Sequence, residues 1–141
     1  MPEDCIFCQI IDGEIPVHDI YENDDVLAFL DANPLAEGHT LVIPKEHHET
    51  TDSLSEDLGG VLGRTVTRLS PAVESAVGAE ASTIGVNNGE AAGQTVPHLH
   101  VHIVPRNEGD GGGTIHSIVG GQTTADDDEL AAVANDIQAG L

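Results

Sequence analysis

Three histidines alternate with aliphatic residues near the end of the chain, in the run HLHVHIVPR at 98–106. Alternate side chains of a β-strand point to opposite faces, so the run predicts a strand with His98, His100 and His102 on one face. The aliphatic residues between them would then face a core. Imidazoles transfer protons, bind metals and attack electrophiles near neutral pH, so this pattern favours a chemical site over simple packing.

The rest of the chain predicts an α+β domain. Its length of 141 residues fits one domain, expected over 1–141. A domain of this size can bury a hydrophobic core without cross-links such as disulfide bonds. Helical spacing begins at Ser53 and reaches Val77, and Pro71 must either kink this helix or begin a second segment. We expect one main helix, short terminal helices and a mainly antiparallel five-stranded sheet. The terminal helices are predicted over 5–11 and 126–138, and the strands over 19–22, 26–31, 39–43, 82–86 and 96–104.

The charge of the chain limits its partners. Four basic residues oppose 25 acidic ones, which gives a formal net charge of −21. Such a charge argues against nucleic acid or an anionic membrane as a partner. The acidic residues are spread along the chain, a distribution that we interpret as adaptation of a halophile to high salt, where charge repulsion is screened. No stretch is typical of a membrane span or a secretory signal, so we expect a cytoplasmic protein.

Cys5 and Cys8 form the only Cys-x-x-Cys pair. A disulfide framework would need more cysteines and a secreted context. Three interpretations stay open from the residues alone: half of a metal site, a redox pair, or two small buried hydrophobic residues.

Several segments together resemble the histidine triad (HIT) family. The run His98–Val104 matches the family signature, in which three histidines alternate with apolar residues. The resemblance covers about residues 5–106, is closest to the Hint-like branch of nucleotide hydrolases and transferases, and does not extend over 107–141. The other matching blocks are 5–11, 13–16, 27–31, 38–45, 86–89 and 93–96.

The resemblance implies a HIT-like fold and covalent nucleotidyl transfer through His100. This histidine would attack the α-phosphorus of a nucleoside phosphoramidate or a dinucleoside polyphosphate. His102 would donate to a phosphate oxygen, and His39 would complete the catalytic set. Two alternatives remain: a metal-dependent hydrolase in which the three histidines of the run are ligands, and a nucleotide-binding module without turnover.

The same resemblance assigns residues to a purine nucleotide. Asp31 would bind the ribose hydroxyls, while Thr95, the backbone around it and Asn87 would contact phosphate through neutral donors. Apolar side chains would form the base pocket, although core packing explains them equally well. The predicted substrate-binding residues are Asp31, Asn87, Gln94, Thr95, Val96, Phe7, Ile10 and Phe29.

Relatives that bind zinc carry a matching Cys-x-x-Cys pair and two matching histidines. The resemblance therefore implies a structural zinc ion held by Cys5, Cys8, His47 and His98, an ordinary tetrahedral set. It implies no organic cofactor. Similar proteins form homodimers by extending a five-stranded sheet across the subunit boundary, so we expect a homodimer.

Overall fold

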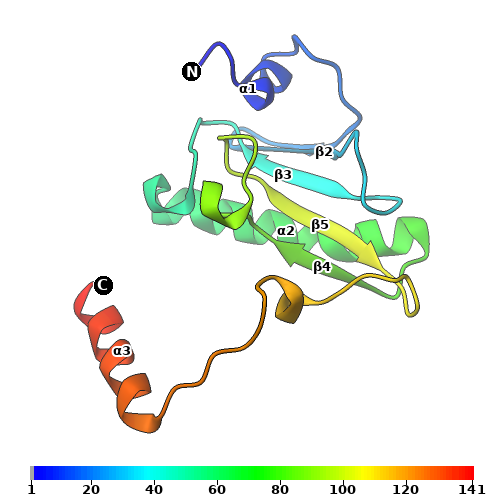
Figure 1. Ribbon diagram of the computed structural model, residues 1–141. Helices are drawn as coiled ribbons and strands as arrows, with labels where there is room; N and C mark the ends of the chain where they lie inside the picture. Colours follow the sequence, from blue (N-terminus) through cyan, green and yellow to red (C-terminus); the bar gives the residue numbers. More distant parts are fainter. Residues whose placement is uncertain (1) are drawn as a thin grey trace. The chain divides into compact units, whose positions relative to one another are not determined.

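The computed structural model describes residues 2–141 and contains one five-stranded antiparallel sheet. The strands are β1 (Asp19–Glu22), β2 (Val26–Leu30), β3 (Thr40–Pro44), β4 (Ala81–Gly85) and β5 (Val101–Arg106). Their order across the sheet is β1-β2-β3-β5-β4, which leaves β1 and β4 at the edges (Figure 1). The predicted fold class is confirmed.

Both faces of the sheet are covered by apolar side chains. On β2, Val26 and Ala28 face the long helix α2 (Glu56–Val77), while Leu27 and Phe29 face the short helix α1 (Ile6–Ile11). This strict alternation follows from the two-residue period of a strand. The sheet is therefore the middle layer, and it separates an α1 side from an α2 side.

Helix α2 is continuous across Pro71, so one of the two predicted alternatives, a second segment beginning there, is excluded. A proline removes one helical hydrogen bond, here to the carbonyl of Thr67. Both residues are exposed, and water can satisfy that carbonyl. Leu69 and Val73 lie buried on either side of the proline and pack both parts of the helix onto the sheet.

The histidine strand is shorter than predicted. Strand β5 begins at Val101, so His98 and His100 precede it in irregular backbone. Pro97 has no N–H to donate to a ladder, and the amide of Leu99 instead donates to the carbonyl of His48 at 2.6 Å. The aliphatic side chains still behave as predicted, because Leu99 and Ile103 are buried in the core and Val101 packs against it.

The chain forms two compact units, the first ending at Asp110 and the second from Gly111 to Leu141. The first contains the sheet and the family-like residues 5–106. The second contains helix α3 (Asp127–Ala139), which Asp126 caps by accepting the amide of Glu129. Whether 1–141 acts as one domain stays a prediction. Within residues 2–141, no helix is both long and apolar enough to cross a membrane.

Candidate active site and metal centre

A cavity of about 440 Å³ opens on the α1 side of the sheet. Its walls come from α1, the end of β2 and the segment that leads into β5. Apolar side chains dominate the lining, with a carboxylate and two imidazoles among them, the usual make-up of a small-molecule site. The predicted site residues that line it are Phe7, Ile10, Phe29, Asp31, Thr95, Val96, His100 and His102.

His100 is held with one ring nitrogen occupied and the other available. Its Nδ1 lies 2.8 Å from the carbonyl oxygen of His98, and a carbonyl can only accept, so Nδ1 carries the proton. The lone pair of a neutral ring is then on Nε2. Phe7 packs edge-on against the ring, with 5.1 Å between centroids, and the side chain is buried. This is the arrangement of an oriented nucleophile.

A hydrogen-bond chain fixes the tautomers of the other two imidazoles. The backbone N–H of Leu35 donates to His39 Nδ1 at 3.1 Å, so His39 carries its proton on Nε2. His39 Nε2 then donates to His102 Nδ1 at 2.9 Å. His102 must therefore carry its own proton on Nε2. Among the described residues, that buried Nε2 is the one buried side-chain polar atom without a hydrogen-bond partner.

Both of these histidines are held neutral. Burial, together with the neighbouring His100 and His39, lowers the pKa of His102 to about 4 against the opposing effect of Asp31. Burial also lowers the pKa of His39, while Asp31 partly raises it. A neutral His102 with its proton on Nε2 is a donor that lacks an acceptor, and a phosphoryl oxygen in the cavity would supply one.

Asp31 lies at the rim of the cavity directly after β2. Its Oδ1 accepts the backbone N–H of Asn33 at 2.9 Å, and its Oδ2 lies 3.7 Å from His39 Nε2. The first contact fixes the carboxylate, and the second distance is too long for a hydrogen bond. Oδ2 therefore remains able to accept from hydroxyl groups of a ligand.

Two of the predicted substrate-binding residues do not line the cavity. The Gln94 side chain braces its own loop: its Oε1 accepts from Gly89 N at 2.8 Å, and its Nε2 donates to Glu49 O at 2.7 Å. Asn87 is exposed in the loop after β4 and does not line the cavity. Of this region, Thr95 and Val96 reach the cavity.

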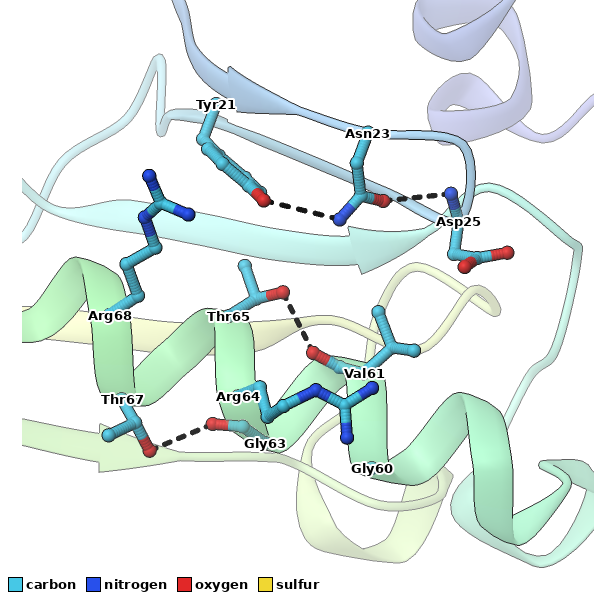
Figure 2. A pocket seen from close by; sticks show the side chains of 10 residues that line it. All are labelled: Tyr21, Asn23, Asp25, Gly60, Val61, Gly63, Arg64, Thr65, Thr67 and Arg68. Atoms are coloured by element: carbon cyan, nitrogen blue, oxygen red, sulfur yellow. Dashed lines mark hydrogen bonds between the residues drawn. The ribbon is translucent and has the colours of Figure 1, made fainter.

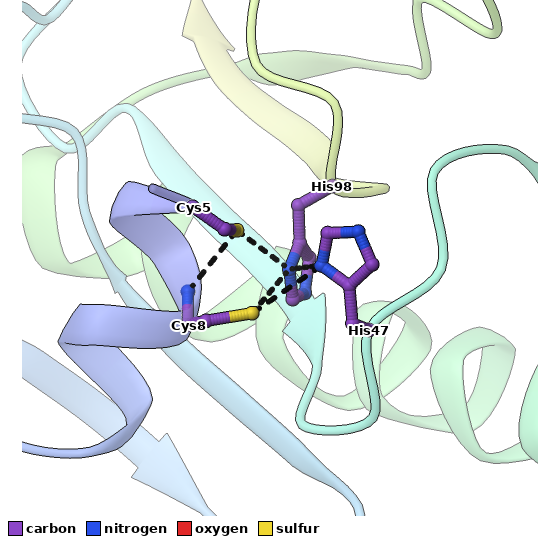
Figure 3. Close-up of side chains that lie close together, drawn as sticks. All are labelled: Cys5, Cys8, His47 and His98. Atoms are coloured by element: carbon purple, nitrogen blue, oxygen red, sulfur yellow. Dashed lines mark hydrogen bonds between the residues drawn. The ribbon is translucent and has the colours of Figure 1, made fainter. Parts of the chain in front are cut away.

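Cys5, Cys8, His47 and His98 converge beside α1, with their ligand atoms within 4.8 Å of one another (Figure 3). Cys5 Sγ lies 3.3 Å from His98 Nδ1, and Cys8 Sγ lies 3.3 Å from His47 Nδ1. The two Nδ1 atoms are 3.2 Å apart. Ligands about 2.0–2.3 Å from a tetrahedral zinc ion stand at comparable separations from one another.

The protonation of this cluster fits a metal centre. His98 Nε2 donates to the carbonyl of Pro44 at 2.8 Å, so its Nδ1 lone pair points at the thiols. Burial, with Cys5 nearby, raises the pKa of Cys8 to about 11. A cation bound between the sulfur atoms would reverse that effect and favour thiolates. Four ligands of this kind, three of them buried, could hold a metal ion in a closed structural site.

The three histidines of the 98–106 run do not form a common ligand set. Within residues 2–141, His98 groups with the cysteines, whereas His102 groups with Asp31 and His39. His100 belongs to neither group, and its Nδ1 is used by a carbonyl. This division does not support a single catalytic metal bound by all three.

Comparison with known proteins identifies the family. The HIT domain model matches residues 12–109, most of the chain and nearly all of the first unit. The chain belongs to the HIT family. It is 43% identical to the adenylylsulfatase HINT3 of Arabidopsis thaliana over 110 residues, which is 78% of this chain and 56% of that protein.

Solved structures share the fold. The SMU.412c protein of Streptococcus mutans is 40% identical with a TM-score of 0.89, and the match covers 99% of this chain and 86% of that one. A zinc-bound histidine triad family protein from Mycobacterium smegmatis is 30% identical with a TM-score of 0.72, and the match covers 98% of both chains.

Some residues of this HIT site were not predicted from the sequence. The cavity is also lined by Ile15, Pro16 and Val17, which follow the turn after α1, and by Leu41 on β3. The block 13–16 was recognised as family-like, and that was the available signal. Leu41 carried none, because a buried leucine in an apolar strand is indistinguishable by sequence from an ordinary core residue.

Proposed function

We propose that the protein is a nucleotide-binding hydrolase or transferase that forms a covalent nucleotidyl intermediate on His100. The observation that carries the proposal is the hydrogen bond from His100 Nδ1 to the His98 carbonyl, which leaves the Nε2 lone pair for attack. A bond forms between Nε2 and the α-phosphorus, and the bond from phosphorus to the leaving group breaks. Water then attacks the same phosphorus and releases His100.

His102 supports this reaction by donating its Nε2 proton to a non-bridging phosphoryl oxygen. That oxygen gains negative charge during attack, and a buried donor already pointing into the cavity stabilises it without reorganisation. The protein has no Walker-type loop and a net charge of −21. Neutral donors of this kind therefore suit a site that must hold a phosphate in an acidic protein. The hydroxyl and backbone of Thr95 serve the same purpose.

A purine nucleotide fits the remaining lining. The base packs among Phe7, Ile10 and Phe29, whose side chains form part of the apolar lining. Oδ2 of Asp31 accepts from the ribose hydroxyls. The substrates are nucleoside phosphoramidates or dinucleoside polyphosphates, and the similarity to an adenylylsulfatase adds adenylyl sulfate to the compounds that should be compared.

Zinc is the proposed metal, held by Cys5, Cys8, His47 and His98. The ion would supply no chemistry to the reaction. It would link α1 to the segment before β5, whose His98 carbonyl orients the nucleophile. The cluster would therefore support the active site by holding the segment that carries the His98 carbonyl in place.

The proposed setting is the cytoplasm of a halophile, where salt screens the charge of −21. The proposed assembly is a homodimer. It is supported by the edge position of β4, where the side chains of Ile84 and Val86 in and after the strand are exposed. Neither nucleic acid nor membrane is a proposed partner.

The test is a rapid-quench experiment with a nucleoside phosphoramidate labelled in the nucleotide. We expect an acid-labile nucleotide adduct that mass spectrometry places on His100 and that His100→Ala abolishes. His116→Ala, which removes a histidine of the second unit, should leave the adduct unchanged. If the protein turns over substrate without forming an adduct, and a chelator abolishes that turnover, metal-dependent hydrolysis would be favoured. Nucleotide affinity without turnover would favour a binding module.

A further inference from the structure

The few basic side chains of this protein are distributed unevenly. Of the four lysines and arginines, Lys45 and Arg106 each contact a carboxylate, at 2.5 and 2.7 Å. Within residues 2–141, the side chains of Arg64 and Arg68 make no ion pair and no hydrogen bond. In a chain with 25 acidic residues, two neighbouring arginines without a carboxylate partner require an explanation.

The sequence of α2 leaves these two arginines unneutralised. They are four residues apart, so they are neighbours on one helix face and repel each other. The positions three and four residues before and after each arginine carry no aspartate or glutamate. A single acidic residue at any of these positions would stabilise the helix. The helix therefore maintains a local positive charge on a strongly negative protein.

Both arginines line one large cavity, of about 910 Å³, between α2 and β1 (Figure 2). Gly60 and Gly63 form part of its helical wall, where any other residue would add a side chain. A Cβ at Gly60 would lie 3.4 Å from the Arg64 guanidinium, in van der Waals contact with the end of that flexible side chain. Glycine costs about 1 kcal/mol in a helix relative to alanine. The open space is therefore maintained against helix propensity.

The opposite wall positions Arg68. Its guanidinium carbon lies 5.2 Å from the centre of the Tyr21 ring, a cation–π contact. Asn23 in turn donates to the Tyr21 hydroxyl at 3.3 Å and accepts the amides of Asp25 and Val26 at 2.8 and 2.9 Å. The ring is thus fixed from the turn between β1 and β2, and the guanidinium keeps its N–H donors for another acceptor.

We propose that this cavity is a second ligand site, which binds a small molecule carrying a phosphate group. Arg64 and Arg68 are exposed long side chains that start one helical turn apart, so both guanidinium groups can reach the oxygens of one phosphate placed between them (Figure 2). The carboxylate of Asp25 lines the same cavity and would accept from a hydroxyl of the ligand, which favours a phosphate monoester of a hydroxylated compound. The site is on the α2 side of the sheet, whereas the histidines are on the α1 side. It does not depend on the proposed reaction.

The probe is glycerol 3-phosphate, titrated into ¹⁵N-labelled protein at constant ionic strength and followed by NMR. We expect saturable shifts of the amides of Gly60 and Gly63 and of the Nε–H groups of both arginines. The double variant Arg64→Gln/Arg68→Gln should weaken binding at least tenfold. Arg106→Gln, which removes one positive charge elsewhere, should bind as the wild type does.

A second pair of variants leaves every charge in place. Gly63→Leu fills the cavity from a position where a Cβ meets no atom within 4 Å, so the fold should persist and binding should be lost. Gly59→Leu, on the same helix but outside the lining, should retain binding. Shifts that do not saturate, or that persist in Gly63→Leu, would overturn the site. Equal binding of citrate would overturn its assignment to phosphate.

Discussion

The ring of His39 donates a hydrogen bond to the ring of His102, with 2.9 Å between Nε2 and Nδ1. Its direction is set by the protein backbone, because the Leu35 amide occupies the other nitrogen of His39. A loop amide therefore decides which nitrogen of a histidine in the candidate site carries a proton. The consequence is a donor at His102 Nε2 without a partner, available to the proposed phosphate before any ligand arrives.

Replacing His39 tests this relay. Alanine removes the donor to His102 and frees its ring to adopt the other tautomer, so we expect turnover of a phosphoramidate to fall about 100-fold. Glutamine places an amide N–H near the position of the imidazole Nε2 and should retain activity within about tenfold of wild type. The measurement is kcat at saturating substrate. Equal losses in both variants would show that the hydrogen bond is not the reason for the defect.

His102 makes stability depend on pH. Its pKa is about 4 in the folded protein against an ordinary value of 6.5, so the unfolded chain takes up a proton first as the pH falls. Its contribution is full above pH 6.5 and is lost as the pH falls toward 4, by up to about 3 kcal/mol. His39, whose pKa is also lowered, acts with the same sign.

Urea unfolding of wild type and His102→Gln at pH 7 and pH 5 measures the effect. The free energy of unfolding should fall more between these two pH values for wild type than for the variant. Protonation of the metal ligands affects both proteins and cancels in the difference. Identical pH dependence in the two proteins would contradict the assignment of a lowered pKa to His102.

The sequence predicted most of the sheet because its strands are short apolar runs between turn residues. It placed His98 and His100 in β5, although both precede it. The reason is that alternation of side chains does not reveal where a strand stops pairing, and here the Leu99 amide bonds the His48 carbonyl outside the sheet. The helix stripe similarly could not show that Pro71 is tolerated, since that depends on the exposure of Thr67.

The residues of the candidate site could also be predicted only in part from the sequence. The histidines and cysteines could be found from the chain because each residue type has few other uses in such patterns. Gln94 was expected to contact phosphate through its backbone, which stays a prediction, whereas its side-chain amide bonds Gly89 and Glu49. A glutamine beside a family motif gives no indication of which direction its side chain takes. That depends on a contact 45 residues away in sequence.

Asp31 should discriminate ribose from dideoxyribose. Asp31→Asn retains the Oδ1 acceptor for Asn33 but loses the charge at Oδ2, and hydrogen bonds to a charged group contribute about 1.5–3 kcal/mol. We expect KM for a ribonucleoside substrate to rise about tenfold or more. A 2′,3′-dideoxy substrate should bind wild type and variant equally. The exposed Asp12→Asn is the control, and an equal KM increase for both substrates would exclude a ribose contact.

Salt should stabilise the protein. The charge of −21 causes repulsion that potassium chloride screens, with a Debye length of about 3 Å at 1 M. We expect the melting temperature to rise by roughly 5 °C or more between about 0.1 M and about 3 M salt. A variant with Glu14, Asp19 and Asp24 changed to amides should show a smaller rise, which separates charge screening from general salting-out. A flat profile for wild type would remove the proposal of a high-salt setting.

Variants of two adjacent histidines, His47 and His48, test zinc binding. His47 Nδ1 lies 3.3 Å from Cys8 Sγ within the cluster, whereas His48 bonds Glu46 and Ser53 outside it. Wild type and His48→Gln, purified without chelator, should carry about one zinc ion per chain. His47→Gln should carry well under half as much, because it removes one of four ligands. Elemental analysis gives the metal content.

The same pair of variants shows what the metal does for the fold. A ligand present at about 1,000 times its Kd stabilises the folded state by about 4 kcal/mol, so His47→Gln should melt about 10 °C or more below His48→Gln. Chelator should lower the melting temperature of His48→Gln and leave that of His47→Gln unchanged. Because the zinc cluster positions the His98 carbonyl that orients His100, the metal-free protein should also lose activity. A stable, fully active His47→Gln protein without zinc would refute a structural role for the metal.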